Sequence, residues 1–105
     1  MSMAIYTPDA RQDLKEIALW IGRKDRRPRV AAKIIREIKS RCDDYARAFE
    51  AGSEIGTAQP ALGQGYRTFS HKRWVIIFRE TNGAIEVMRV VDGAHDYGRL
   101  FGREQ

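Results

Sequence analysis

The sequence is poor in residues that bind metals or form disulfides. Cys42 is the only cysteine among 105 residues, and the only histidines are His71 and His95. A single cysteine forms no internal disulfide, and this set of residues has none of the spacings of a metal site. Phosphate-binding loops of the GxxxxGK type and nucleophile elbows are absent as well. We therefore expect a cytoplasmic protein with no metal and no other cofactor.

The chain also lacks long apolar runs. No stretch approaches the roughly 20 apolar residues of a membrane span. Residues 1–8 have neither the basic start nor the long apolar stretch of a signal peptide. We expect no membrane segment and no secretion.

The composition that remains is that of an ordinary folded domain. Hydrophobic residues make up 43% of the chain and charged residues 31%, and a chain of this length supports one small core. We predict a single domain over residues 1–105. The net charge of +5 favours anionic partners. Basic residues crowd between positions 23 and 29, where we expect a solvated loop between two helices.

A short strand and a helix open the chain. Residues 3–7 form an apolar entry that fits an edge strand. Thr7-Pro8-Asp9 then has the pattern of a helix start, with an N-cap, a first-turn proline and an acidic residue. Leu19 and Trp20 fall outside the apolar side of this helix, so we predict a small partner-binding patch there. The apolar side itself consists of Ala10, Leu14, Ile17 and Ile21.

A second helix follows a break at Gly22 and the basic run up to Pro28. Glu37 and Arg41 are four residues apart and are expected to pair on its outer face. Cys42 belongs to the buried side, which favours a packing role over that of a nucleophile. The apolar residues at helical spacing are Ala31, Ile35, Ile38, Cys42, Tyr45 and Phe49.

Three strands are predicted after a loop at residues 51–65. Asn82-Gly83 is typical of a two-residue type I′ turn and sets the register of the last hairpin, in which Arg79 faces Glu86. The same register pairs Thr81 with Ala84, Phe78 with Val87, Ile76 with Arg89 and Trp74 with Val91. The predicted strands are Tyr66–Ser70, Arg73–Glu80 and Ala84–Val91.

The predicted fold class is α+β. It consists of an N-terminal strand, an α-helical hairpin, a three-stranded antiparallel meander and a short C-terminal helix or tail. Both faces of the last β-hairpin carry large apolar groups, and the helices can cover only one of them. Trp74 and Ile76, or their counterparts, would then need a cover. The candidates are the tail from Tyr97 to Phe101, a second copy of the chain, or a separate protein.

Polar residues gather where the last strand ends. Cations around a histidine could hold phosphate and move protons in a metal-free ribonuclease. The alternative is a strand terminus and protein-contact surface, with Arg89 extending its alkyl stem across from Ile76. We favour this second interpretation. The residues concerned are Arg73, Arg89, His95, Asp96 and Tyr97.

Five segments, in their order along the chain, carry a family resemblance. They are YTPDARQDLKEIALWI, AAKIIREI, QPALGQGYR, WVIIFRETNGAIEVMRVVDGAHD and YGRLF. Together they resemble the RelE/ParE superfamily of bacterial toxins, and the ParE branch in particular. The resemblance implies a strand, a helical hairpin and an antiparallel sheet whose concave side and edges are covered by an antitoxin peptide.

The two branches of this superfamily differ in their targets. The RelE branch cuts messenger RNA on the ribosome, whereas ParE toxins are described as poisons of DNA gyrase. Arg73 matches a RelE arginine, but Gln64 and Tyr66 stand about where the catalytic lysines lie. His95 stands where a second arginine is expected, and Phe101, which has no hydroxyl, stands near the tyrosine. The resemblance therefore implies that nuclease chemistry is absent.

The turn DGAHD resembles the HGARD turn of ParE toxins, with Asp92 in place of the first histidine and His95 in place of the arginine. Because this family turn is altered, a degenerate toxin retained only as a binding module is one hypothesis. A second is a RelE-like ribosome-dependent mRNA endonuclease with Arg73, His95 and Tyr97 as catalytic residues.

The leading hypothesis is a ParE-like toxin of a type II toxin-antitoxin system. It would inhibit DNA gyrase by protein contact, without enzymatic chemistry, and a ParD-like antitoxin would neutralise it in a hetero-oligomer. The predicted antitoxin or target contacts are Leu19, Trp20, Trp74, Ile76, Arg89, Tyr97, Leu100 and Phe101.

Overall fold

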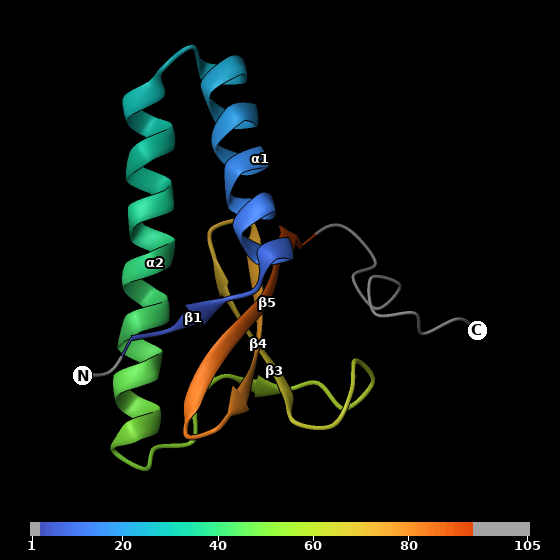
Figure 1. Cartoon of the computed structure of the whole chain (residues 1–105). Coiled ribbons are helices and arrows are strands. Elements are labelled where there is room, and N and C mark those ends of the chain that lie inside the picture. The colour runs from blue at the N-terminus through green and yellow to red at the C-terminus, as the bar shows by residue number, and fades with distance from the viewer. Residues whose placement is uncertain (1–2, 94–105) are drawn as a thin grey trace.

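The computed structural model describes residues 3–93 and has the predicted α+β architecture. Two helices lie side by side and pack against one face of an open sheet (Figure 1). The strand order is β1-β5-β4-β3-β2, in which β1 is parallel to β5 and all other neighbours are antiparallel. The elements are β1 (Ile5–Tyr6), α1 (Pro8–Asp25), α2 (Pro28–Glu50), β2 (Thr57–Ala58), β3 (Tyr66–His71), β4 (Trp74–Thr81) and β5 (Ala84–Asp92).

The predicted loop after α2 contains a strand, and the predicted C-terminal element is not described. The segment 51–65 was expected to be a loop, but it contains the short edge strand β2, which pairs with β3. Two exposed residues carry too little apolar pattern to indicate a strand from sequence. The predicted C-terminal helix or tail lies outside the described residues. Within residues 3–93, no helix is long and apolar enough to cross a membrane.

Helix α1 begins where the sequence predicts. The Thr7 hydroxyl accepts a hydrogen bond from the Ala10 amide at 3.0 Å, which satisfies one of the free amides of the first turn. The predicted apolar side is buried throughout. The helix continues past Gly22 to Asp25, because one glycine costs a helix only about 1 kcal/mol. It ends at Arg26, which adopts the left-handed conformation.

Helix α2 buries its predicted side against the sheet. Ile38 and Cys42 are fully buried, and the Tyr45 ring stacks on Phe69 of β3 with 4.2 Å between centroids. The predicted pair of Glu37 with Arg41 is replaced by contacts of both residues with His71 of β3.

His71 lies between the two side chains. Its Nε2 bonds the Glu37 carboxylate at 2.9 Å, and Arg41 Nη1 donates to its Nδ1 at 3.4 Å. Because a guanidinium only donates, Nδ1 is the acceptor and Nε2 carries the proton. This bond from His71 is the main reason that the pKa of Glu37 is lowered. A tertiary neighbour thus displaces an interaction that local spacing predicted.

The β4–β5 hairpin has the predicted turn and, at first, the predicted register. Asn82 and Gly83 both have positive φ, at 49° and 79°, as a type I′ turn requires. The predicted pairs Thr81–Ala84, Arg79–Glu86 and Phe78–Val87 are present.

The register then shifts at a β-bulge, and the remaining predicted pairs are wrong. Ile77 faces Arg89, so Met88 is an extra residue on β5. Ile76 therefore faces Val90 instead of Arg89, and Trp74 faces Asp92 instead of Val91. The bulge has no glycine to mark it in the sequence.

The helices cover the face of the sheet that carries Trp74 and Ile76. Trp74 is 7% exposed and Ile76 is fully buried, and both belong to one core cluster with Ile17 and Ile38 of the helices. Trp74 and Ile76 therefore need no further cover, which leaves the expectation only for their counterparts on the opposite face.

Candidate functional site

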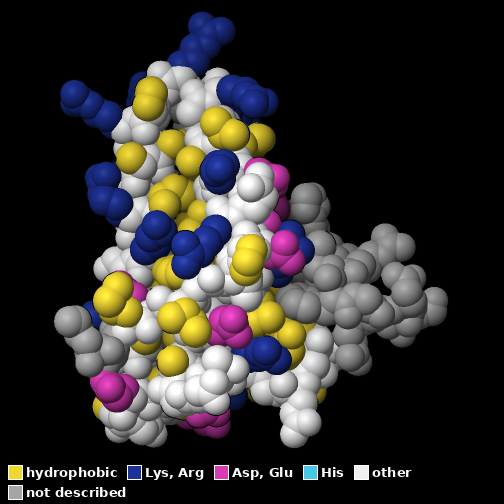
Figure 2. Space-filling model, viewed as in Figure 1, with side chains coloured by type: hydrophobic (Ala, Val, Ile, Leu, Met, Phe, Trp, Pro, Cys, Tyr) yellow, Lys and Arg dark blue, Asp and Glu magenta, His cyan; other side chains and the backbone are white. Residues whose placement is uncertain are grey.

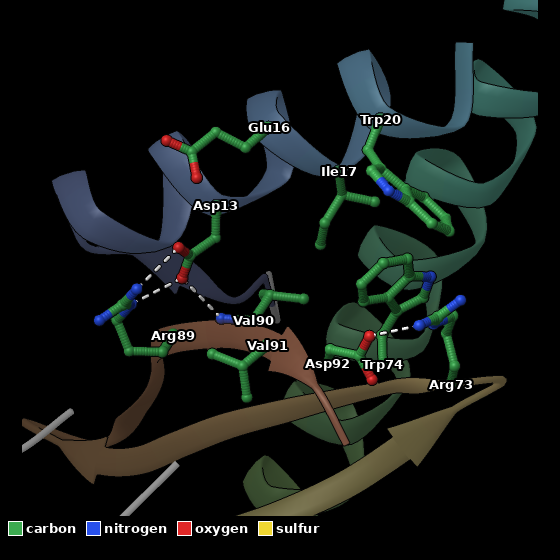
Figure 3. Close-up of a pocket in the computed structure, with 10 residues that line it drawn as sticks. All are labelled: Asp13, Glu16, Ile17, Trp20, Arg73, Trp74, Arg89, Val90, Val91 and Asp92. Atoms are coloured by element: carbon green, nitrogen blue, oxygen red, sulfur yellow. Dashed lines mark hydrogen bonds and ion pairs between the residues drawn. The ribbon is translucent and has the colours of Figure 1, made fainter. Parts of the chain in front are cut away.

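An open groove of about 530 Å³ lies between α1 and the ends of β4 and β5 where the two strands pair (Figure 3). One wall is a single face of α1, because residues spaced three and four apart point the same way. The opposite wall is formed by the start of β4 and the end of β5. The lining residues are Asp13, Glu16, Ile17, Trp20, Arg73, Trp74, Arg89, Val90, Val91 and Asp92.

Two tryptophans meet at one end of this groove. The Trp20 and Trp74 rings are perpendicular, with 6.0 Å between centroids. Trp74 is buried beneath, whereas Trp20 remains 42% exposed. The Arg73 guanidinium lies 4.8 Å from the Trp20 centroid and Lys24 Nζ lies 5.0 Å from it. Cations over an indole ring hold it in place while leaving apolar surface open to a partner.

Asp13 and Arg89 form an ion pair at the other end of the groove. Arg89 Nε and Nη2 donate to the two carboxylate oxygens at 2.7 and 2.9 Å. The prediction that Arg89 only extends its alkyl stem across from Ile76 is wrong, because Arg89 faces Ile77 and its guanidinium bonds Asp13. The hydrogen bonds that Arg89 donates to Asp13 are the main reason that the pKa of Arg89 is raised above its ordinary value.

The same carboxylate fixes α1 to the bulged strand. Asp13 Oδ2 accepts from the Val90 amide at 2.9 Å, and the Thr7 hydroxyl donates to the Met88 carbonyl at 2.9 Å. Asp13 of α1 and the N-cap residue Thr7 therefore both bond backbone groups beside the bulge. Asp13 was not predicted from the sequence, although its position on the apolar side of α1 was a signal. A carboxylate among buried residues needs a partner.

Arg73 also has a carboxylate partner. Its guanidinium bonds Asp92 at the end of β5, and its carbonyl accepts from the Gly93 amide at 2.8 Å. Figure 3 shows the two arginines at opposite ends of the groove, each facing an acidic side chain. They do not converge on a common point as a phosphate site would require.

The predicted contact residues are placed on different surfaces. Trp20, Trp74 and Arg89 line the groove. Leu19 is 54% exposed but lines a separate hollow on another side of α1, so it does not form one patch with Trp20. The fully buried Ile76 offers no surface to a partner in this fold. His95, Tyr97, Leu100 and Phe101 lie outside the described residues.

Cys42 lies in the core, away from the groove. It is fully buried, and burial raises the pKa of its thiol to about 11. A thiol of this kind is almost entirely protonated near neutral pH and is a poor nucleophile. Within residues 3–93, no group of three His, Cys, Asp or Glu side chains is arranged to hold a metal ion.

The fold defines a small α+β protein in which a helical hairpin packs on one face of an open sheet. The fold is similar to that of a solved structure described as "Chromosomal ParDE TA system from P. aeruginosa", with a TM-score of 0.73. The sequences are 20% identical, and the match covers 88% of this chain and 96% of that chain.

Residues 4–97 match the family model described as "ParE toxin of type II toxin-antitoxin system, parDE". The chain therefore belongs to the ParE toxin family. No curated protein sequence matches the chain.

Proposed function

We propose that this ParE-family toxin inhibits DNA gyrase by protein contact, in the cytoplasm, and that a ParD-like antitoxin neutralises it by covering the groove that contains Trp20 and Trp74. Family membership supports a toxin with an antitoxin partner. The choice between protein contact and RNA cleavage depends on the chemistry of the groove.

The main support for protein contact is that both arginines of the groove are bonded to carboxylates. Arg73 bonds Asp92 and Arg89 bonds Asp13. Stabilising the charge of a phosphoryl transition state requires cations that face the phosphate. Freeing either arginine would break an existing ion pair, which costs energy before any substrate is bound.

The open part of the groove suits a protein partner. Tryptophan and arginine are the residue types that most often dominate binding energy at protein interfaces. Trp20 presents an exposed indole, and the apolar side chains of Val90 and Val91 line the same groove. A partner side chain placed there would bury apolar surface on several sides.

The decisive experiment compares two assays with purified components. We expect the toxin to inhibit supercoiling by gyrase and to leave messenger RNA intact on programmed ribosomes. In bacteria, its induction should stop division and produce filaments with DNA damage. Cleavage of mRNA in the ribosomal A site without inhibition of gyrase would favour the ribonuclease hypothesis. Normal growth with confirmed folded protein and tight antitoxin binding would favour a degenerate binding module.

The Trp20→Ala variant tests the groove itself. We expect it to stay folded and to lose most of its inhibition of gyrase, because the exposed indole is removed from the contact surface. The control is Leu19→Ala, which removes a comparably exposed side chain from the other side of the same helix. Equal inhibition by the two variants would argue against the groove as the contact site.

A further inference from the structure

The net positive charge of the chain is concentrated around the turn between α1 and α2. Residues 23–36 contain seven lysines and arginines and one acidic residue, which gives this segment a net charge of +6. Because the whole chain has a net charge of +5, the remaining 91 residues have a net charge of −1. The basic tip consists of six side chains of this segment: Arg23, Lys24, Arg26, Arg27, Arg29 and Lys33.

The basic tip lies at the end of the helical pair that extends beyond the sheet (Figure 1). Helix α1 ends at Asp25 and α2 begins at Pro28, so the loop predicted at residues 23–29 is reduced to Arg26 and Arg27. The other four side chains belong to the helix ends, where the backbone fixes their spacing. Figure 2 shows lysine and arginine side chains projecting from this end of the molecule.

The charges of the basic tip have little compensation within the chain. All six side chains are exposed. Of the carboxylates whose side chains the structure describes, none lies within ion-pair distance of them. Asp25, the one acidic residue of the segment, can offset only one charge. Arg29 and Lys33 are four residues apart on α2, and like charges at this spacing destabilise a helix. An anionic partner would relieve that repulsion.

The absence of apolar surface around these charges narrows the class of partner. Protein interfaces have an apolar centre from which charged residues are depleted. In the described part of residues 21–41, no large hydrophobic side chain is exposed. A helix that lies in a membrane surface also needs an apolar face. Cations alone suit a polymer with a regular array of phosphates, because binding then releases its counterions. Four of the six residues are arginines, whose guanidinium bonds phosphate through two parallel hydrogen bonds.

We propose that the basic tip binds the phosphodiester backbone of duplex DNA. Arg29, Lys33 and Arg36 follow one side of α2 over about 10 Å, a length over which one strand of B-DNA has about three phosphates. Contacts with phosphates carry no sequence information, so the binding is independent of sequence. The choice of duplex DNA rests on the proposed function, because a toxin that contacts gyrase acts beside duplex DNA. The phosphate chemistry rests on the tip alone.

Two triple variants with the same net charge test this assignment. The tip variant combines Arg27→Gln, Arg29→Gln and Lys33→Gln. None of these three residues makes a side-chain ion pair with a described carboxylate, and Arg27 does not cap α2 through its side chain. The control variant removes three exposed charges elsewhere, through Lys15→Gln, Arg47→Gln and Lys72→Gln. Circular dichroism confirms that both variants are folded.

The probe is a fluorescein-labelled DNA duplex of about 20 base pairs, two turns of the double helix. Fluorescence anisotropy measures its binding to the full-length toxin over a range of salt concentrations. The tip variant should bind at least about tenfold more weakly, and the slope of log affinity against log salt should fall by about 2–3, because each phosphate contact contributes about 0.9. The control variant should lose less than about threefold in affinity and less than about one in slope.

Equal losses in the two variants would overturn the proposal, because binding would then follow net charge alone. A strong preference between two duplexes of unrelated sequence would overturn backbone contact. Tighter binding of the toxin to an RNA duplex of the same sequence, or to phosphatidylserine vesicles, would overturn duplex DNA as the partner.

The supercoiling assay separates this inference from the proposed function. The tip variant should need about tenfold more toxin for half inhibition of gyrase, because one of two linked contacts is lost. Inhibition of gyrase by a wild-type toxin that does not bind the duplex by itself would overturn the inference and leave the proposed function standing. Binding of DNA through the tip without any inhibition of gyrase would overturn the proposed function and leave the tip as a DNA-binding site.

Discussion

Arg89 of β5 donates two hydrogen bonds, from Nε and Nη2, to the two carboxylate oxygens of Asp13 of α1, although the residues are 76 positions apart in the chain. Asp13 also accepts from the Val90 amide, so one carboxylate joins the first helix to the bulge of the last strand. The exposed fraction is 10% for the Asp13 side chain and 24% for that of Arg89. This relationship fixes one wall of the groove relative to the other.

Removing that carboxylate should destabilise the fold. Asp13→Ala leaves a half-buried guanidinium and a buried amide without partners, which should lower the free energy of unfolding by about 2 kcal/mol. Urea denaturation measures the change. The control is Asp44→Ala, which breaks an exposed pair with Arg47 and should cost less than about 0.5 kcal/mol. Similar losses in the two variants would contradict a structural role for Asp13.

The two tryptophans should separate stability from binding. Trp74→Ala empties a core position and should cost about 3–5 kcal/mol. Trp20→Ala loses the ring contact with Trp74 and the cation contacts with Arg73 and Lys24, and should cost about 1–2 kcal/mol. Under the proposed function, Trp20→Ala should weaken antitoxin binding by about 30-fold, measured by calorimetry on folded protein. Unchanged affinity would exclude the groove as the antitoxin site.

Two glycines in the loop after α2 should respond differently to the same replacement. Both have positive φ, at 88° for Gly52 and 69° for Gly56. A Cβ at Gly52 meets nothing, so Gly52→Ala should cost about 1 kcal/mol for the left-handed backbone alone. At Gly56 it would lie 2.8 Å from Phe78 Cζ and 2.9 Å from the Thr68 carbonyl.

Gly56→Ala should therefore cost about 3 kcal/mol, because the clash with a core ring adds to the backbone cost. Thermal unfolding of the two variants gives the comparison. A Gly56→Ala variant as stable as Gly52→Ala would show that the Phe78 ring moves aside without cost.

Alkaline pH should destabilise the protein through Cys42. Burial raises the pKa of its thiol from 9.0 to about 11, so the folded protein holds this proton more tightly than the unfolded chain does. The resulting stabilisation is complete below pH 9 and is lost as the pH rises toward 11.

Cys42→Ala should flatten the decline in unfolding free energy between pH 9 and 10, the range before Tyr6 titrates in the unfolded chain at 10.0. A thiol-reactive dye at neutral pH should label the wild-type protein only after denaturant is added. Rapid labelling of the native protein would show that Cys42 is accessible.

Local sequence signals predicted much of the fold. The Thr7-Pro8-Asp9 start, the apolar side of each helix and the Asn82-Gly83 turn all act over a few residues, so they can be read before any tertiary contact is known. The predicted hairpin register is correct from the turn to Phe78, which is as far as the turn alone controls the pairing. Exposure of Trp20 was predicted by the same helical periodicity.

The sequence by itself determined the two helices, the strands of the β3–β5 meander and which side of each helix is apolar, because these depend on spacing within one element. The tertiary structure decided the bulge in β5, the bond of Asp13 to Arg89, and the placement of Leu19 and Trp20 in two separate hollows. These features depend on which elements pack together across most of the chain length. Hydrogen bonds and packing between residues distant in the chain determine these features, and the spacing of residues within one element does not predict them.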